Sequence, residues 1–475
     1  MKITKPFWLK HYTSIYSIDV HPVRENIFLT SSLEGEIKFW NLDECVNICN
    51  DIEASCEPIL TIKCPSSLNC VKWSNTGTYV IVGLLCGSIL IYTFHYSINS
   101  TTLESTIVSR HLTTLDGTHK SDITDVQVSS NGKWLASSSF DRKVVVWDTQ
   151  NNFSLISILE GHNSLVKGLS FDPLSEYLVS YSDDKTIIFW ECSTWKPIHT
   201  INLKHPIDYC TNVKGESFFL KLSWSPDGEY LSIPHVAHHS HGQNSFIIVS
   251  RKSKFTELTL TPIRDHTQST TICRYSPLQY QNPNPESLYH LLLVGGKDGT
   301  LSIYLIPTET VQPKKLCSIT KLFEYPIQDI IGFKDGYTFA VSSSEGTIVF
   351  LQINSQELNA KPVIKLSSSL NNLDSVSSTN DSVQMDIDIP KLYPTDYVKN
   401  NQIKSTNSLG RKRITPVNSQ NISKKSTQTT STQESNKIKQ SKIFNFKRKG
   451  GLIIEGLEEN QKVIDLVNIL NKPVR

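Results

Sequence analysis

Residues 126–147, VQVSSNGKWLASSSFDRKVVVW, contain the pattern that decides the fold. An apolar segment is followed by a polar turn, a segment of small residues, a tight turn that holds Asp141, and a β-branched segment that ends at Trp147. Short apolar segments bounded by Asn, Gly and Asp are typical of antiparallel strands joined by tight turns. The stretch therefore predicts three consecutive strands of one antiparallel sheet.

The same pattern recurs along the chain, and its recurrence predicts the architecture. Four copies are close, at residues 17–40, 71–92, 126–147 and 161–190, and three are looser, at residues 222–249, 272–304 and 330–351. The ends of the close copies lie 52, 55 and 43 residues apart, a little above the period of about 40–45 residues of four-stranded propeller blades. One four-stranded sheet cannot bury both of its faces alone, whereas sheets arranged around an axis cover one another. We therefore predict an all-β fold, a seven-bladed β-propeller over residues 1–355.

The two ends of this region are expected to meet. The seventh copy ends at Leu351, and residues 1–10 contain a further segment, Ile3 to Leu9, that can form the outer strand of the last blade. Such pairing would remove an exposed sheet edge and make the ring cooperative.

A different composition begins near Ser355. All eight Trp lie at or before position 224, and the later residues are rich in Ser, Asn, Thr and Lys. Such a segment cannot offset its ordering entropy by burial, so we expect a disordered linker over 356–409 and a disordered basic segment over 418–449. Residues 450–475 contain an apolar pattern between 458 and 470. This pattern predicts a short amphipathic helix that docks on another surface or, alternatively, a frayed tail.

Charge is unevenly distributed along the chain. The 47 Lys and Arg nearly balance the 45 Asp and Glu, yet residues 404–449 hold twelve basic residues and one acidic residue. This segment predicts weak, salt-sensitive contact with DNA, and it has few aromatic residues for base stacking. The first residues lack the apolar core of a secretory signal, and no stretch approaches the length of a membrane span, so we expect no membrane partner. The ten cysteines form no CxxC pair and predict reduced thiols.

A basic run at residues 410–417, GRKRITPV, has two compatible interpretations. Clusters of Lys and Arg often act as nuclear-import signals. The other interpretation is an extended strand that adds to the edge of a partner's sheet. In that strand Ile414 and Val417 would fill apolar pockets, and Arg411 and Arg413 would face acidic residues.

Other motifs predict no chemistry. His235, His238, His239 and His241 could bind zinc or nickel, but no Cys or acidic residue lies near them, so an exposed loop is favoured. Residues 295–300, GGKDGT, lack the spacing of a phosphate-binding loop and predict a turn between strands. The chain has no GxSxG or HExxH motif, and no GxGxxG follows a strand. We therefore predict no catalytic residues, no cofactor, no metal site and no enzyme activity.

His and Asp recur at fixed places within the repeats. In the third, fourth and sixth copies a His precedes the first strand, and an Asp lies six residues before the last aromatic residue. Over residues 1–355 the chain resembles the WD-repeat proteins, in which a His, a turn Asp and the closing Trp are linked by hydrogen bonds within a blade. The resemblance implies a structural role for His119, Asp141, Trp147, His162, Asp184, Trp190, His266 and Asp298. The second copy departs from the pattern, with Cys86 at the acidic position.

The opening residues and the basic run carry a more specific resemblance. Residues 1–11, MKITKPFWLKH, and 17–22, SIDVHP, resemble the start of the HIRA (histone regulator) family. Residues 69–75 and 161–169 resemble its second and fourth blades, and RKRITPV at 411–417 is similar to its B motif. The resemblance implies that this motif binds the anti-silencing-function histone chaperone, which carries a core histone dimer, through Arg411, Lys412, Arg413, Ile414, Thr415, Pro416 and Val417. It also implies that the propeller holds a ubinuclein-like subunit.

The function implied by this resemblance is that of a non-catalytic scaffold subunit of a nuclear histone chaperone complex. Such a subunit acts on chromatin in replication-independent nucleosome assembly and in transcription regulation. Two features depart from the family. The chain stops at Arg475, where family members usually continue into a second folded domain, and Lys412 stands where arginine would make a bidentate contact. These departures leave self-association and a third subunit open.

Two other functions remain open from the sequence. One is the propeller subunit of the replication-coupled chromatin assembly factor, which shares the architecture and a similar docking motif. The other is a generic WD-repeat adaptor, such as a substrate receptor of a ubiquitin ligase. Trp-Asp followed by x-Arg would favour that role, but neither Trp147-Asp148 nor Trp190-Glu191 is followed in this way.

Overall fold

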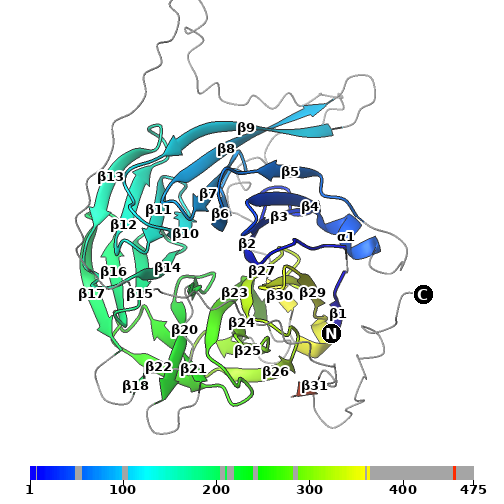
Figure 1. The fold of residues 1–475 in the computed structure, drawn as a ribbon. Coiled ribbons are helices and arrows are strands. Elements are labelled where there is room, and N and C mark those ends of the chain that lie inside the picture. Colours follow the sequence, from blue (N-terminus) through cyan, green and yellow to red (C-terminus); the bar gives the residue numbers. More distant parts are fainter. Residues whose placement is uncertain are drawn as a thin grey trace, which may run out of the picture. The chain divides into compact units, whose positions relative to one another are not determined.

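The computed structural model describes residues 1–6, 8–48, 56–98, 105–203, 209–210, 219–238, 244–281, 287–358, 361–363 and 453–455. In this part of the chain seven antiparallel sheets are arranged around a central axis (Figure 1). The prediction of a seven-bladed β-propeller is therefore confirmed.

Within each blade the first strand lies next to the axis and the last strand lies at the periphery. Blades one to three consist of β2 (Ile15–Val20), β3 (Ile27–Ser32), β4 (Glu36–Asn41) and β5 (Leu60–Lys63); of β6 (Leu68–Trp73), β7 (Tyr79–Leu84), β8 (Ile89–Ile98) and β9 (Ser105–Leu115); and of β10 (Ile123–Val128), β11 (Trp134–Ser139), β12 (Val144–Asp148) and β13 (Ser154–Leu159). Blades four and five consist of β14 (Val166–Phe171), β15 (Tyr177–Ser182), β16 (Thr186–Glu191) and β17 (Lys196–Asn202); and of β18 (Tyr209–Cys210) and β19 (Ser223–Trp224), which both pair with β20 (Tyr230–His238), followed by β21 (Asn244–Ser250) and β22 (Leu258–Pro262). Blades six and seven contain β23 (Thr270–Gln281), β24 (Leu288–Gly296), β25 (Leu301–Pro307) and β26 (Lys314–Thr320); and β27 (Ile327–Gly332), β28 (Thr338–Ser343), β29 (Ile348–Gln352) and β1 (Lys2–Thr4).

The repeated sequence pattern corresponds to the first three strands of a blade. The outer strand lies outside the pattern. One of its edges has no neighbouring strand, so fewer contacts constrain which residue types it contains. Blade one also contains a short helix that we did not predict, α1 (Leu42–Ile48), between β4 and β5. This insertion contributes to the spacing of 52 residues between the first two copies.

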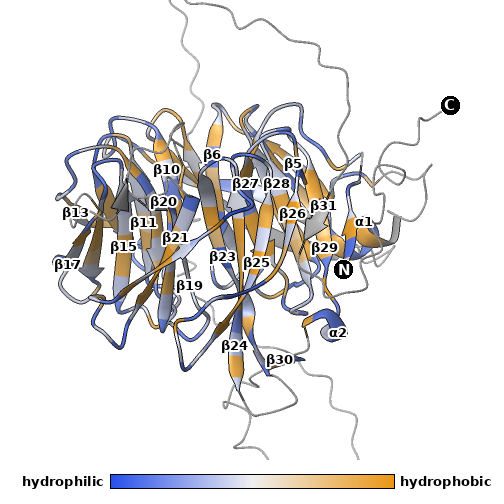
Figure 2. Ribbon diagram, turned by 90° about the horizontal axis from the view of Figure 1, so that it is seen from below, coloured by the Kyte–Doolittle hydropathy of each residue, from blue (hydrophilic) through white to orange (hydrophobic). Residues whose placement is uncertain are grey.

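The hydrophobic core lies between neighbouring blades. Ala136 and Val146 of blade three form one apolar cluster with Leu178 and Ile188 of blade four. Because each sheet is covered on both faces, the residues of β12 from Val144 to Trp147 are all buried. Figure 2 shows the apolar residues concentrated along the strands. Because both faces of a third strand such as β12 are buried, its sequence is a continuous apolar run rather than an alternation of apolar and polar residues.

A glycine is required in the turn between β24 and β25. Gly299 has a φ of +71°, and a Cβ at this position would collide with the backbone carbonyl of Phe323. The segment 295–300 therefore serves as a tight strand turn, which is the role we predicted in place of a phosphate-binding loop.

The two ends of the propeller meet in blade seven. β1 pairs antiparallel with β29, with Ile3 opposite Leu351. The strand is shorter than the expected 1–10: it ends at Thr4, and beyond it Lys10 forms only a single bridge with Thr347. Pro6 lacks the backbone N–H that a continuous ladder would need.

Two described elements lie where we expected a disordered linker from residue 356. The short helix α2 (Ser355–Leu358) buries Leu358 in the core of blades six and seven, and β30 (Lys361–Val363) pairs with β23, with Pro362 opposite Tyr280. The expected boundary is therefore wrong, because apolar burial and strand pairing offset the ordering entropy of these residues.

The C-terminal region contains one described strand, which lies before the residues for which we expected a helix or a frayed tail. β31 (Ile453–Glu455) pairs antiparallel with β26 at the periphery of blade six, with Ile454 opposite Ile319. The helix expected over 458–470, the rest of the linker, the motif at 410–417 and the basic segment at 418–449 lie outside the described residues. Neither α1 nor α2, the helices that the structure describes, is long enough to cross a membrane.

Candidate functional site

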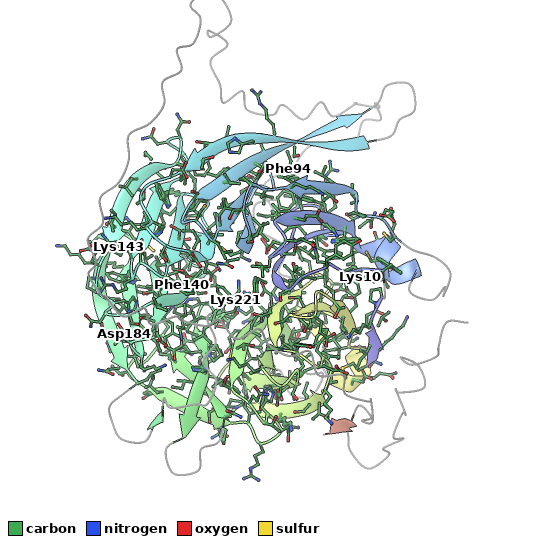
Figure 3. All side chains as sticks on the ribbon, in the orientation of Figure 1. Lys10, Phe94, Phe140, Lys143, Asp184 and Lys221 are labelled. Atoms are coloured by element: carbon green, nitrogen blue, oxygen red, sulfur yellow. The ribbon has the colours of Figure 1, made fainter. Side chains whose placement is uncertain are left out.

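The predicted partner-binding residues, Arg411 to Val417, lie outside the described part of the chain. The structure describes all eight predicted blade residues and a set of polar and aromatic groups around the axis. Figure 3 places Lys221 at the centre of the ring, with Lys143 and Asp184 farther out.

Blade three contains the hydrogen-bond network implied for WD repeats, with an additional residue. His119 Nδ1 lies 3.0 Å from Asp141 Oδ2, and His119 Nε2 lies 2.9 Å from Ser137 Oγ. Trp147 Nε1 donates to the same Ser137 Oγ over 3.2 Å. Burial by itself would raise the pKa of Asp141, but the hydrogen bond and charge of His119 outweigh it and lower the pKa. Thus Ser137, on β11, joins the His and the Trp.

Blade four repeats the arrangement with one further group. His162 Nε2 lies 2.7 Å from Ser180 Oγ, which also accepts a 2.9 Å hydrogen bond from Trp190 Nε1. His162 Nδ1 is 3.5 Å from Asp184 and 3.0 Å from the hydroxyl of Thr186, which in turn donates to Asp184. The network in blade four is therefore complete but includes Thr186.

Blade six contains only part of the network. His266 Nε2 lies 2.9 Å from Ser302 Oγ, but His266 Nδ1 is 3.8 Å from Asp298, beyond hydrogen-bond distance. The third strand has Tyr304 at the position of the closing Trp. The register places Val294 where blade three has Ser137, so the His and the aromatic residue share no serine on the second strand.

Blade one has a complete network that the sequence analysis missed. His11 lies 2.8 Å from Glu34 and 2.7 Å from Thr30, and Trp40 Nε1 donates to Thr30 over 3.0 Å. The hydroxyl residue precedes the Trp by ten positions in blades one, three and four, which is the sequence signal that would have found it. Burial lowers the pKa of His11 to about 4, so the ring is neutral near pH 7.

Two histidines, His11 and His235, have surroundings that bear on metal binding. His11, Glu34 and Glu36 bring their ligand atoms within 4.8 Å of one another, but both ring nitrogens of His11 already have partners in the blade-one network. His235 is 2% exposed, so the expectation of an exposed loop is wrong for this residue. Burial lowers its pKa to about 3, and neither ring nitrogen has a hydrogen-bond partner. The side chain of His238 and residues 239–243 lie outside what the structure describes.

Charged side chains connect blades across the axis. Lys221 Nζ lies 3.8 Å from Asp125 and 3.7 Å from Asp329, and Arg274 lies 3.0 Å from Asp329. Burial opposes the charge on Lys221, but the two carboxylates outweigh it and raise the lysine pKa. Lys221 thus links blades three, five and seven, and we call these four residues the axial cluster. The sequence signal was a charged residue inside an otherwise apolar first strand, as in Asp125 and Asp329.

Aromatic residues gather at one mouth of the axis. The ring of Phe219 lies 5.1 Å from that of Tyr16 and 6.3 Å from that of Phe140, and all three are partly buried. These residues lie near the starts of the first strands or in a turn between a second and third strand, so they share one face of the ring. We call them the aromatic mouth. Half-buried aromatic residues of this kind are enriched in protein interfaces.

A small cavity opens on the opposite face, where first strands end. Its volume is about 230 Å³, and it is lined by Asp19, Val20, Pro22, Lys72, Trp73, Ser74, Asn75, Gln127 and Val128. Lys72 Nζ lies 2.8 Å from Asp19, whose carboxylate also accepts the backbone N–H of Trp73. The two charges therefore neutralise each other within the cavity.

Comparison with known proteins agrees with this architecture. The CAF1B/HIR1 β-propeller domain family matches residues 1–358. Protein HIRA of Dictyostelium discoideum is 33% identical over 372 residues, which cover 76% of this chain and 31% of the relative. Protein hir1 of Schizosaccharomyces pombe is 28% identical over 377 residues, covering 75% and 38%, and Protein HIR1 of Mycosarcoma maydis is 25% identical over 374 residues, covering 74% and 35%.

These matches identify the family and show how much of each protein the similarity covers. The chain spans about a third of the length of the curated relatives that it matches. The matched family domain coincides with the seven blades and ends at Leu358, the last residue of α2. The chain therefore belongs to the HIRA/HIR1 family of β-propeller proteins.

Proposed function

We propose that this protein is a non-catalytic scaffold subunit of a nuclear histone chaperone complex, active in replication-independent nucleosome assembly and transcription regulation. The observation that carries the proposal is the pairing of a HIRA/HIR1 propeller with the strand-like motif at 411–417 in the same chain. A scaffold needs no chemistry of its own, because tethering a histone carrier close to other subunits raises its effective concentration.

The motif recruits the anti-silencing-function histone chaperone together with its core histone dimer. Residues 411–417 combine β-branched Ile414 and Thr415 with the arginines Arg411 and Arg413. An extended segment of this kind gains affinity from main-chain hydrogen bonds and specificity from its alternate side chains. The same basic run serves nuclear import, and residues 404–449 add weak contacts to DNA phosphates.

The propeller holds the ubinuclein-like subunit, and the aromatic mouth is the surface that we assign to it. Tyr16, Phe140 and Phe219 offer amphipathic and apolar rings on one face. The axial cluster supports this face, since buried charge pairs fix the relative positions of blades three, five and seven. A rigid docking surface loses little conformational entropy on binding.

The recruitment step is tested with the full-length chain and the purified anti-silencing-function chaperone. We expect Ile414→Asp to weaken binding by about 2–4 kcal/mol, since a charge replaces an apolar anchor. Ile422→Asp is the matched control, because it places the same charge in the same segment outside the motif. Titration calorimetry gives both affinities. Equal affinity of the Ile414→Asp variant and the unsubstituted chain would remove the proposed strand docking.

A second candidate is the propeller subunit of the replication-coupled chromatin assembly factor. The matching family supports this candidate, because it includes CAF1B beside HIR1. Purification of the tagged chain from cells, read by mass spectrometry, separates the two. A ubinuclein-like protein among the co-purified subunits supports the first function, and subunits of the assembly factor in its place support the second.

A further inference from the structure

The outer strands of the described blades differ in how their free edges are protected. β13 reads SLISIL and contains no charged residue and no proline. Each of the other described outer strands contains at least one Lys, Arg or Pro: Lys2 in β1, Lys63 in β5, Arg110 in β9, Lys196 and Pro197 in β17, Pro262 in β22, and Lys314 and Lys315 in β26. Charges and prolines at edge strands prevent pairing with other chains. β13 lacks this protection.

The side chains of β13 are also unusually exposed for apolar residues. Leu155, Ile156 and Ile158 are 48%, 39% and 40% exposed. The pairing between β12 and β13 skips Ile156, so this residue bulges from the ladder. Contiguous apolar residues on an exposed edge indicate an interaction surface.

Blade four shows what a protected edge looks like at the same positions. β17 meets Trp190 through Pro197, as β13 meets Trp147 through Leu155. Counting from these pairs, Ile198 corresponds to Ile156, and His199 corresponds to Ser157. The bulged isoleucine is thus common to both blades, whereas the Lys and Pro before it are present only in β17.

The sequence of β13 identifies the partner that fits it. Residues 155–159 read LISIL, which is the same in both directions. In an antiparallel pair centred on Ser157, Ile156 of one copy lies opposite Ile158 of the other, and Leu155 lies opposite Leu159. We propose that β13 is the interface of a homodimer in which two copies pair edge to edge about a two-fold axis through Ser157. Such an interface is self-complementary, as a two-fold dimer requires.

Blade six shows that an outer blade edge of this molecule accepts an added strand. The short strand β31 comes from a distant segment and pairs antiparallel with the outer strand β26. A second copy of β13 would extend blade three in the same way, to a sheet of eight strands across two propellers. This inference is independent of the proposed function, which would hold equally for a monomer.

Disulfide cross-linking at the two-fold axis is the sharpest test. In the proposed dimer the two Ser157 residues face each other directly, at a separation that a disulfide can bridge. Full-length Ser157→Cys, oxidised and run on a non-reducing gel, is expected to give a cross-linked dimer as the main product. His199→Cys on β17 is the matched control: it is expected to give no disulfide-linked dimer and to run as a monomer on the gel, as is the unsubstituted chain with its exposed Cys86. Equal yields from Ser157→Cys and His199→Cys would overturn the proposal.

Sedimentation equilibrium between about 1 and 100 µM tests the same dimer without cysteine chemistry. We expect the unsubstituted chain to dimerise, Ile156→Lys to weaken the dimer at least tenfold, and Ile198→Lys on β17 to leave it unchanged. Lys is tolerated at both exposed positions, so folding is retained, and a circular-dichroism melt verifies this. A monomeric unsubstituted chain, or a dimer that is insensitive to Ile156→Lys, contradicts the proposal. If the unsubstituted chain is monomeric and Ile156→Lys abolishes the binding of another protein, then β13 binds that protein and the homodimer is refuted.

Discussion

Blade three and blade six reach stability by different means. Blade three has a complete network of His119, Ser137, Asp141 and Trp147, and no described strand of the same chain pairs with the outer edge of β13. Blade six lacks the second-strand serine and the His–Asp hydrogen bond, but additional strands extend it on both sides, β30 at β23 and β31 at β26. We infer that added strand pairing compensates for the missing side-chain hydrogen bonds.

The largest expected effect lies at the axis, which both blades contact. Lys221→Met should lower the free energy of unfolding by about 3–5 kcal/mol, because Asp125 and Asp329 would remain buried without their shared cation. Denaturant unfolding followed by tryptophan fluorescence measures the loss. Lys143→Met is the control, since its pair with Glu160 is solvent-exposed and its removal should change stability little. Similar losses in both variants would show that the axial cluster is not a stabilising link.

The second prediction compares the two histidines directly. His119→Ala removes hydrogen bonds to Ser137 and Asp141 and should cost about 3 kcal/mol, whereas His266→Ala removes one and should cost about 1 kcal/mol. Both side chains are buried, so the cavity contributions are similar and the difference reports the networks. Unfolding curves of the two variants provide the measurement. If the loss in blade six equals that in blade three, the incomplete network is not weaker.

The third prediction concerns pH and blade three. The pKa of Asp141 is lower in the folded state than its unfolded value of about 3.9, so its ionised form stabilises the fold above that pH. This contribution is lost as the pH falls from about 4 through the lower folded pKa. Thermal melts between pH 2 and pH 6 should therefore show a smaller acid-induced drop in stability for Asp141→Asn than for the unsubstituted chain. Identical pH profiles would mean that the network does not stabilise the charged carboxylate.

The smallest expected effect is in the edge of blade six. Truncation after Lys449 removes β31 and should lower the free energy of unfolding by less than about 1 kcal/mol, because only three residue pairs are lost. Hydrogen exchange of β26 should rise towards that of the outer strand β22, while β17 serves as an internal control. Unchanged exchange in β26 would show that β31 does not protect this edge in solution.

Much of the fold was predictable because the propeller is built from local signals. Most blades have a polar turn, a turn acid and a third strand rich in β-branched residues, and these recur at nearly constant spacing, as at Asp141 and Trp147. The outer strands and the elements after residue 355 were harder, since their partners are distant in sequence. Leu358 is buried against blades six and seven, and β31 finds its place only beside β26.

The candidate sites divide in the same way. The His, Asp and Trp of blades three and four were found from their spacing. Ser137 and Thr30 were missed, because the signal they give is a spacing of ten residues before the closing Trp rather than a distinctive residue type. The axial cluster was missed as well. Lys221, Arg274, Asp125 and Asp329 belong to four different blades, and only the closed ring brings them together.

By itself, the sequence determined the class of fold, the number of blades and the resemblance to the HIRA family, because strands, turns and the motif at 411–417 are encoded by residues that are neighbours in the chain. Only the tertiary structure decided which charges meet at the axis, which rings form the aromatic mouth and which outer edges are covered. These features arise from ring closure, which joins residues hundreds of positions apart, as β1 joins β29. Burial and pairing at such distances depend on the whole ring, so no local pattern can reveal them.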